Sequence, residues 1–232
     1  MGEVVSLLER PVYTYPQVDR VLGLSDGTAL RWLNGYKRRG ISYPPILRQE
    51  PRGTRWVNWG EFLEARLLAG YRDFDKIPVQ RMRRVVEELR EQFDRTYPLA
   101  CAAPYVQAAG RRMLWQAQED AGLPDVFAVE VGTGQISLAP WVTDFVESAS
   151  FEDTGDAAIT AIQPDRDFPA ITLNPSLRGG EPVIDGRNVR VTTIAGLVRG
   201  GEDLRDVAEW YELAESDVRQ AVEYDRRHAR IA

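Results

Sequence analysis

The stretch Gly180–Val191 reads Gly-Glu-Pro-Val-Ile-Asp-Gly-Arg-Asn-Val-Arg-Val, and it decides the fold of the C-terminal part. Two short apolar runs lie on either side of Asp185-Gly186, a dipeptide that suits a type I′ turn because both central residues of that turn need a positive φ. Helical patterns follow at residues 193–199, 203–211 and 216–229. The last two begin at the capping residues Asp203 and Ser216. The stretch therefore predicts a β-hairpin and three short helices, the last two joined as a helix-turn-helix.

The charge of this chain of 232 residues is unevenly distributed. Residues 1–99 hold 17 Arg and Lys against 13 Asp and Glu, whereas residues 100–232 hold 12 against 22, so these parts carry +4 and −10. A basic front and an acidic rear indicate two different partners. Residues 202–225 contain nine acids and only two arginines. We therefore expect the C-terminal helices to repel phosphates and to bind a protein instead of DNA.

Residue usage argues against several classes of function. Cys101 and His228 are the only cysteine and histidine, which argues against a disulfide and against a Cys/His metal site. No nucleophile stands beside a base, and Gly132-Thr133-Gly134 lacks the helix and basic residue of a phosphate loop. Charged residues interrupt the first thirty positions, and no apolar run reaches the ~18 residues of a membrane span. We expect a cytoplasmic protein that is not an enzyme and needs no metal or cofactor.

Another helix-turn-helix pattern lies near the N-terminus. Residues 15–24 and 27–33 have apolar residues at helical spacing, and Ser25-Asp26 is the expected cap of the second helix. Thr28 and Arg31 are expected on the exposed side of that helix. Because ordinary helical hairpins show the same spacing, the residues that follow have to support a DNA-binding function.

The residues after this pattern predict a basic wing. Consecutive prolines make residues 43–48 extended, residues 52–55 form a basic turn, and Trp56–Asn58 form a strand. Together these segments indicate a β-hairpin tipped with arginine. A helix with apolar residues at helical spacing begins near Gly60.

The order of these elements resembles the MerR-like winged helix-turn-helix family. Arg31-Trp32 stands at that family's Arg-aromatic pair in the recognition helix, and Arg55-Trp56 at the Arg-aromatic pair of its wing. The resemblance covers about residues 13–72 and implies a dimeric DNA-binding domain. The expected DNA contacts are Thr28, Arg31, Lys37, Arg38, Arg39, Arg52 and Arg55.

Residues 77–93 predict a helix with an apolar stripe. The stripe consists of Val79, Met82, Val85, Val86, Leu89 and Phe93. Such a stripe is typical of a helix packed on a core, and a dimer seam is the alternative.

The middle of the chain changes character. Short apolar runs flank Ala109-Gly110-Arg111, and two more flank residues 132–135, which predicts two β-hairpins in a small antiparallel sheet. Residues 141–146 are expected to be a short helix or an edge segment. Residues 148–169 are rich in Ser, Asp, Gly and Pro and are expected to be a linker, and residues 170–173 to be a strand.

The expected architecture is mainly α, of the α+β class. The expected domains are a winged helix-turn-helix domain with a long helix (residues 1–96), a β-hairpin insert (97–147), a linker (148–169) and a three-helix domain (170–232).

The C-terminal stretch resembles the domain of unknown function 433, whose signature is G-x-P-x-I-x-G-T-R-V-x-V. The matching residues are Gly180, Pro182, Ile184, Gly186, Val189 and Val191. Arg187-Asn188 stands where that family usually has Thr-Arg, and Arg190 stands where it often has Pro. The resemblance covers about residues 170–226, and it implies an antitoxin component that acts beside a PIN-like ribonuclease toxin.

With a MerR-like front, a small β insert and this C-terminal part, the chain as a whole resembles the longer VapB-type antitoxins. This implies an antitoxin of a type II toxin-antitoxin module that neutralises a VapC-like PIN-domain ribonuclease and represses its own operon by binding operator DNA. The chain is expected to form a homodimer or a hetero-oligomer with the toxin. The expected toxin contacts are Arg187, Arg190, Trp210, Arg226, Arg227 and Arg230. The last three could pair with carboxylates of the toxin.

Three other functions stay open at the level of sequence. A stand-alone MerR-like transcriptional regulator could sense a ligand in the sheet of residues 97–146. A carboxylate-dependent nuclease would need Mg²⁺, and an adaptor would bind a protein with each of its two helix-turn-helix modules.

Overall fold

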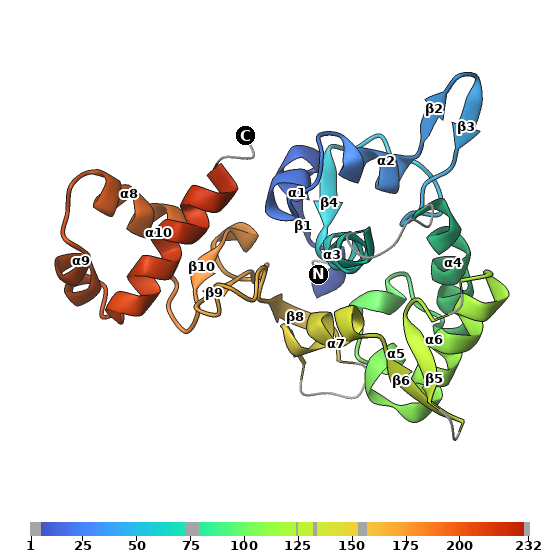
Figure 1. Cartoon of the computed structure of the whole chain (residues 1–232). Helices are drawn as coiled ribbons and strands as arrows, with labels where there is room; N and C mark the ends of the chain where they lie inside the picture. The colour runs from blue at the N-terminus through green and yellow to red at the C-terminus, as the bar shows by residue number, and fades with distance from the viewer. Residues whose placement is uncertain (1–5, 73–78, 124, 132–133, 153–156, 230–232) are drawn as a thin grey trace, which may run out of the picture. The chain divides into compact units, whose positions relative to one another are not determined.

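The computed structural model describes residues 6–72, 79–123, 125–131, 134–152 and 157–229, and the chain divides into two compact units (Figure 1). The first unit runs to Ile159 and the second begins at Thr160. This boundary lies inside the segment whose composition predicts a linker. Part of that segment forms strands, because β7 (Ala149–Phe151) pairs with β8 (Ile159–Ile162).

In the first unit, two helices lie in sequence between strands β1 (Pro11–Thr14) and β4 (Trp56–Asn58), which pair antiparallel with each other. The helices are α1 (Tyr15–Val21) and α2 (Thr28–Asn34), and α3 (Trp59–Arg72) follows β4 directly. A short 3-10 turn, η1 (Leu7–Glu9), precedes β1. All three helices lie where the sequence predicts them.

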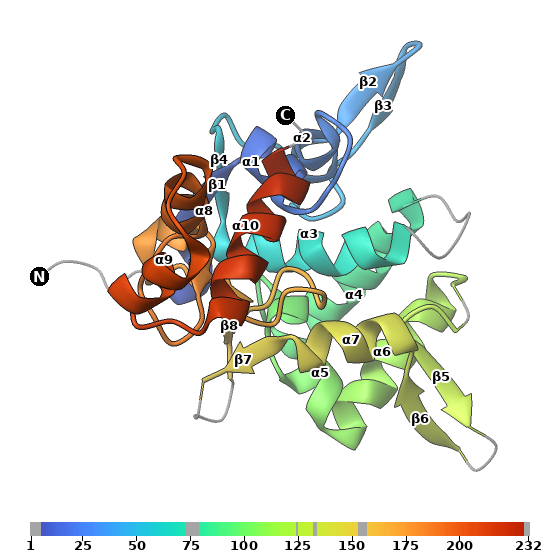
Figure 2. The ribbon, with the colours of Figure 1, turned by 60° about the vertical axis from the view of Figure 1, so that its left-hand side comes forward.

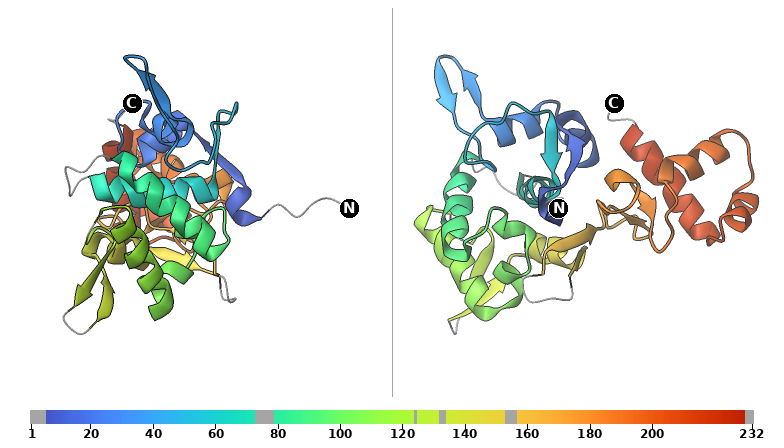
Figure 3. Two further views of the ribbon diagram at one scale, coloured as in Figure 1. Left: turned by 90° about the vertical axis from the view of Figure 1, so that its right-hand side faces the viewer. Right: turned by 180° about the vertical axis from the view of Figure 1, so that it is seen from behind.

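The hairpin of this unit consists of β2 (Tyr36–Arg38) and β3 (Ile41–Tyr43), and it projects from the body of the unit in every view (Figure 1, Figure 2, Figure 3). Arg39 and Gly40 at its tip have φ of +50° and +81°, as a type I′ turn requires. The predicted wing of residues 43–58 is therefore wrong, because β4 pairs with β1 instead. Pro44 and Pro45 have no backbone N–H to donate to a ladder, which keeps that segment out of a hairpin.

Helices dominate the second half of the first unit. Its elements are η2 (Val79–Arg81), α4 (Met82–Phe93), η3 (Pro98–Ala100), α5 (Ala103–Val106), α6 (Ala108–Asp120), β5 (Ala128–Val131), β6 (Gln135–Leu138) and α7 (Pro140–Glu147). β5 and β6 form the second predicted hairpin, which is confirmed. The first predicted hairpin is wrong, because α5 and α6 occupy its residues. Gly110 lies inside α6, where a Cβ atom would stand 1.9 Å from the carbonyl oxygen of Ala103, so this glycine permits close helix packing and does not mark a turn.

The apolar stripe of α4 belongs to the core. Met82, Val85, Val86 and Leu89 are all 0% exposed, and α4 packs against α6 and η3. The alternative of a dimer seam is therefore wrong for these four residues, because the first unit itself covers them, whereas Phe93 of the same stripe is half-buried. Residues 77 and 78, where the sequence places the start of this helix, and the side chain of Val79 lie outside the described part.

The second unit is a pair of short strands followed by three helices. β9 (Ile171–Thr172) pairs antiparallel with β10 (Val183–Ile184), and the turn η4 (Arg178–Gly180) lies between them in sequence. The helices are α8 (Val191–Arg199), α9 (Leu204–Trp210) and α10 (Glu215–Ala229). The cap of α9 is confirmed, since Asp203 Oδ1 accepts a hydrogen bond of 2.8 Å from the N–H of Arg205. Ser216 is not a cap, because α10 begins one residue before it.

The turn at Asp185-Gly186 differs in type from the predicted one. The N–H of Arg187 donates to the carbonyl of Ile184 at 3.0 Å, and within the turn only Gly186 has a positive φ, +66°. A positive φ at the third position alone is the pattern of a type II turn. The second predicted strand is reduced to a bridge at Arg190, after which α8 begins.

The fold class is the expected mixture of α and β, mainly helical, with antiparallel sheets of two strands in the described ranges. Within these ranges, every helix is too short or too polar to cross a membrane.

Candidate nucleic-acid and protein interfaces

Asp19 of α1 joins the first two helices of the chain. Its side chain is 3% exposed, and its two carboxylate oxygens accept hydrogen bonds of 2.7 Å from the N–H groups of Gly27 and Ala29. These donors lie at the start of α2, where backbone N–H groups lack partners and the helix dipole favours a negative charge. The predicted cap at Ser25-Asp26 is wrong, because α1 supplies the cap and so fixes the angle between the helices.

We expect Asp19→Ala to lower the free energy of unfolding by about 2 kcal/mol, since it leaves two donors of a partly buried helix start without an acceptor. Urea unfolding measures this change. Asp26→Ala is the matched control and should change stability by less than about 0.5 kcal/mol. If Asp26→Ala instead destabilises the protein more than Asp19→Ala does, the start of α2 is capped at Ser25-Asp26, as the sequence predicts.

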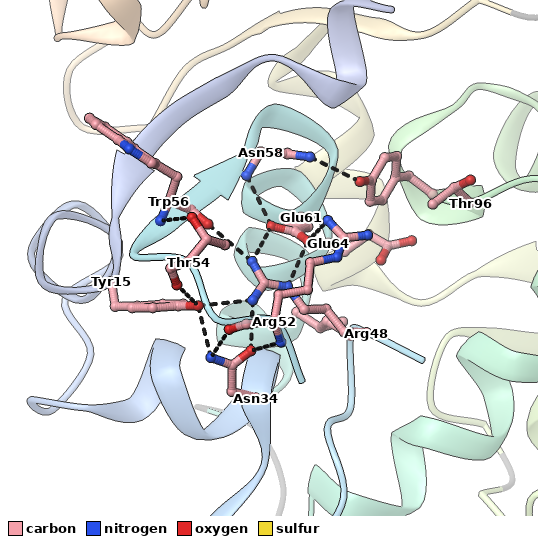
Figure 4. A network of polar contacts seen from close by, with 12 residues as sticks. Tyr15, Asn34, Arg48, Arg52, Thr54, Trp56, Asn58, Glu61, Glu64 and Thr96 are labelled. Carbon is pink, nitrogen blue, oxygen red and sulfur yellow. Dashed lines mark hydrogen bonds and ion pairs between the residues drawn. The ribbon is translucent and has the colours of Figure 1, made fainter. Parts of the chain in front are cut away.

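Arg48 lies at the centre of a buried polar network (Figure 4). Its side chain is 2% exposed, and Nε and Nη2 donate to the two oxygens of Glu61 at 2.7 and 2.8 Å. The remaining acceptors are Tyr15 Oη at 2.8 Å, Asn34 Oδ1 at 2.7 Å and the Trp56 carbonyl at 3.1 Å. Burial lowers the pKa of Arg48, but the hydrogen bonds and charges of Glu61 and Tyr15 together outweigh burial and raise that pKa above its ordinary value. The cation is therefore permanent, with an acceptor for each N–H group.

Glu61 is the acceptor at the centre of the same network. It is 0% exposed, and besides Arg48 it accepts from Arg52 Nη1 at 3.2 Å and from the N–H of Asn58 at 3.0 Å. Because Asn58 directly precedes α3, this last bond ties Glu61 to the start of its own helix. Removing Arg48 would leave this buried carboxylate without its principal partner.

Asn34 ends α2 and uses all of its hydrogen-bonding capacity. Its Nδ2 donates to Tyr15 Oη at 2.9 Å and to the carbonyl of Arg52 at 3.1 Å. Its Oδ1 accepts from Arg48 at 2.7 Å and from the N–H of Arg52 at 3.0 Å. Since Tyr36 begins the hairpin two residues later, this network fixes α2, the base of the hairpin and the loop at Arg52 to one another (Figure 4).

Glu64, one turn further along α3, is a second buried carboxyl group. It is 0% exposed, Oε1 accepts from the N–H of Leu99 at 3.3 Å, and Oε2 lies 3.7 Å from Nη2 of Arg90. Burial raises the pKa of Glu64 to about 8, although the charge of Arg90 and the Leu99 N–H lower it. The carboxyl group is therefore largely protonated at neutral pH.

Glu64 should make the stability of the first unit depend on pH. Its pKa is about 8 in the folded state against 4.5 for an ordinary glutamate, so the folded state holds an extra proton between these values. The free energy of unfolding therefore falls as pH rises from about 4.5 through 8. Glu64→Gln, which cannot ionise, should raise Tm at about pH 9 and change it little near pH 5. Calorimetry across this range compares the two proteins; a variant that is less stable at pH 9 would mean that a charged pair with Arg90 outweighs burial.

The β2–β3 hairpin carries an exposed basic tip. Lys37, Arg38 and Arg39 are all exposed. At its base the rings of Tyr36 and Tyr43 stack with centroids 4.6 Å apart, which stiffens the hairpin. A stiff arm that holds three cations away from the body of the unit suits contact with nucleic-acid phosphates.

The remaining expected DNA contacts differ in exposure. Arg31 is exposed, but Thr28 is 5% exposed and its hydroxyl accepts from Arg31 Nη2 at 2.8 Å. The expectation that Thr28 faces outward is wrong, and this residue positions Arg31 instead. Arg55 is exposed with its Cζ 5.2 Å from the ring centre of Trp56, which is 40% exposed. Arg52 is half exposed and shares its guanidinium with the buried network.

A cavity of about 810 Å³ lies beside the network, within the first unit. Residues 47–52 line one part of it, and Glu87, Arg90 and Glu91 of α4, with Asp94 just after that helix, line another. Its volume is in the range of small-molecule pockets. It lies outside the β5–β6 hairpin, where the sequence places a possible ligand site. Within the described residues, no group of His, Cys, Asp or Glu side chains is arranged to hold a metal ion.

Two arginines expected to bind a toxin form surface ion pairs in the second unit. Arg187 Nη1 lies 3.3 Å from Glu212, and Arg190 pairs with Glu181. All four side chains are well exposed, so these pairs add little stability and can exchange partners.

The arginines at the end of α10 are also engaged within the second unit. Arg227 Nη1 lies 3.0 Å from Asp165 and 2.8 Å from Asp167, and the hydrogen bond to Asp167 contributes most to a raised pKa of Arg227. Arg226 pairs with a glutamate of its own helix at 2.7 Å. Arg230 lies outside the described residues. Trp210, in contrast, presents its ring to solvent and is 57% exposed.

Sequence patterns miss the residues that fix the helices, the hairpin and the Arg52 loop of the first unit. These residues are Asp19, Asn34, Arg48, Glu61 and Glu64. Glu61 does carry a signal, since a glutamate three residues after an asparagine at a helix start is typical of a capping arrangement. No local pattern marks Arg48, because its partners Glu61 and Tyr15 lie 13 and 33 positions away.

Residues 171–224 match a family described as a protein of unknown function (DUF433). This match confirms the resemblance carried by Gly180–Val191. It covers β9, β10 and the helices α8 and α9 completely, and α10 as far as Tyr224.

Relatives from Mycobacterium tuberculosis extend over nearly the whole chain. The "Putative antitoxin VapB45" is 27% identical over 227 residues, which cover 92% of this chain and 93% of that protein. The X-ray crystal structure of Rv2018 has a TM-score of 0.76 at 24% identity, covers 94% of this chain and 100% of its own, and shows a common fold. The "Uncharacterized protein Rv2308" is 43% identical over 227 residues, 97% of this chain and 94% of that protein. With this identity over almost its full length, the chain belongs to the same protein family as Rv2308.

Proposed function

We propose that the chain is the antitoxin of a type II toxin-antitoxin module, which neutralises a PIN-domain (VapC-like) ribonuclease toxin and represses its own operon by binding operator DNA. The observation that carries this proposal is the similarity to a protein named as an antitoxin. That similarity extends over 92% of the chain and is not confined to the DUF433 part, so it takes in most of the first unit as well.

The first unit supports the DNA-binding half of this proposal. Its exposed cations lie on the hairpin (Lys37, Arg38, Arg39), on α2 (Arg31) and beside Trp56 (Arg55). The network around Asn34 and Arg48 fixes these elements relative to one another. A preformed set of cations is what phosphate contacts need, because their number sets both the affinity and its salt dependence.

The second unit supports the protein-binding half. Its helical part, residues 202–225, holds nine acids against two arginines, which opposes binding to phosphates. The same charge complements a protein whose surface is basic, as the RNA-binding surface of a ribonuclease has to be.

Co-expression of the full chain with the product of the adjacent reading frame tests this proposal. We expect the two proteins to purify together, the chain to suppress RNA cleavage by its partner, and the complex to shift a DNA fragment from upstream of the gene pair. The proposal fails if the chain neither retains nor inhibits such a ribonuclease.

A stand-alone transcriptional regulator is the second candidate, and the cavity of about 810 Å³ favours it. Arg52 and Glu61 line the cavity and also belong to the network that holds the DNA-facing loop, so a ligand there would touch the DNA-binding elements. Gene context separates the two candidates, because the regulator needs no adjacent PIN-domain reading frame.

A further inference from the structure

Trp210 is the most exposed of the six tryptophans. It stands at the end of α9 and is 57% exposed, whereas its neighbours Val207 and Ala208 are buried in the core of the second unit. Burying a tryptophan removes about 150–250 Å² of surface from water, which is favourable. A partner that covers the exposed indole of Trp210 would therefore gain binding free energy from it. Tryptophan is also enriched among the residues that dominate protein interfaces.

Carboxylates surround this indole on α9. Asp206 precedes Trp210 by four positions, which places it on the same helix face, and Glu209 directly precedes Trp210 in the sequence. Glu202 lies just before the helix. All three acids are exposed, and within the described residues none of them forms an ion pair. Arg205 is an exposed cation on the same helix, but the acids of residues 202–210 outnumber it by four to one, so the surroundings of Trp210 carry a net negative charge.

The arginines at the end of α10 occupy a different place. α10 runs for 15 residues, or about 22 Å, from the turn after Trp210 to the position of the tail arginines. Arg226 and Arg227 are already paired with carboxylates of the second unit. One partner surface of ordinary size could reach both places, but within the described part of the second unit only α9 exposes a large apolar side chain.

We propose that the outer face of α9 is the docking surface for the toxin, with Trp210 entering an apolar notch that basic residues surround. This inference rests on the proposed function. In the ribonuclease, such a notch is the RNA-binding surface, where an apolar wall stacks bases and cations hold phosphates. The indole takes the place of a base and the carboxylates take the place of phosphates, so the chain inhibits by competing with RNA.

The chemistry of α9 argues against nucleic acid as the occupant, because Asp206 and Glu209 carry the same charge as its phosphates. A second copy of the chain could bring its own basic hairpin to α9. In that case self-association would depend on Trp210, which the test below measures.

The test measures binding of the full chain to the purified PIN-domain ribonuclease encoded beside its gene, inactivated in its own active site. Trp210→Ala should weaken binding at least about 30-fold, the effect of a dominant interface residue. Glu209→Arg should weaken binding at least about 10-fold at low salt, and less at high salt. A single-stranded RNA oligonucleotide should displace the chain.

Matched controls lie in the first unit. Trp56→Ala removes the other exposed tryptophan, and Glu130→Arg makes the same charge change at an exposed position of β5. Both should leave ribonuclease binding unchanged. Because Trp210 is exposed, its variant should keep the Tm of the unaltered chain.

Each contrary outcome is distinct. Unchanged binding by Trp210→Ala would overturn the inference and leave the proposed function in place, with the arginines as the contact. If Trp210→Ala abolishes self-association and leaves ribonuclease binding unchanged, α9 binds a second copy of the chain, and the inference is overturned as well. Simultaneous binding of RNA would remove the competitive mechanism. If the unaltered chain binds no such ribonuclease, the inference and the proposed function fail together.

Discussion

Arg48→Ala will destabilise the first unit by about 3–5 kcal/mol. The change leaves Glu61, which is 0% exposed, without its bidentate partner, and removes donors from Tyr15 and Asn34. A buried carboxylate that loses its cation cannot regain water, so the cost exceeds that of an exposed ion pair. Urea unfolding measures the loss, and hydrogen exchange should place it at α2, β4 and the start of α3.

The matched control is Arg84→Ala, which removes an exposed arginine of α4 and should cost less than about 0.5 kcal/mol. The double variant Arg48→Met, Glu61→Leu should be more stable than Arg48→Ala, because it removes both buried charges together. If Arg48→Ala behaves like Arg84→Ala, the network does not hold these elements together.

If the chain binds operator DNA as we propose, neutralising the hairpin tip is expected to have the largest effect on that binding. Replacing Lys37, Arg38 and Arg39 by alanine removes three exposed cations, each suited to one phosphate contact. We expect affinity to fall on the order of 100-fold, and the slope of log affinity against log salt to fall by roughly 2.7, or about 0.9 per contact. Fluorescence anisotropy with a DNA fragment from upstream of the gene pair, at several salt concentrations, measures both quantities.

A control of equal charge separates this contact from a general loss of positive charge. Arg81, Arg84 and Arg112 are exposed arginines away from the hairpin. Replacing these three by alanine should leave the salt slope within about one unit. Equal losses in the two triple variants would show that only net charge matters, and an unchanged slope in the hairpin variant would remove β2–β3 from the DNA contact.

A type I′ turn of this protein lies at the basic tip and not at the position that the sequence predicts. Arg39 and Gly40 form the type I′ turn, yet the sequence favours Asp185-Gly186 for that turn type, where the structure has a positive φ only at Gly186. Arginine is an uncommon residue at a positive φ, so propensity gives no warning of the turn at the tip. Stacking of Tyr36 on Tyr43 supplies the missing stabilisation, and that contact exists only once the hairpin has formed.

The sequence by itself determines the helices α1, α2, α3 and α9, the DUF433 segment and the division of charge between the two parts of the chain. These features depend on local signals, because a helix is specified by caps and by apolar residues three and four positions apart. Asp203 is an example, since its cap is made two residues away.

Only the tertiary structure determines that β4 pairs with β1 and that Arg48 and Glu61 are buried. It also explains the glycine at position 110, where a side chain would collide with the backbone of Ala103. The partners in these cases are distant in sequence: Thr14 opposite Trp56, and Tyr15 beside Arg48. Strand pairing and the burial of a charge depend on which surfaces meet after the chain has folded, and residues far from the site supply those surfaces.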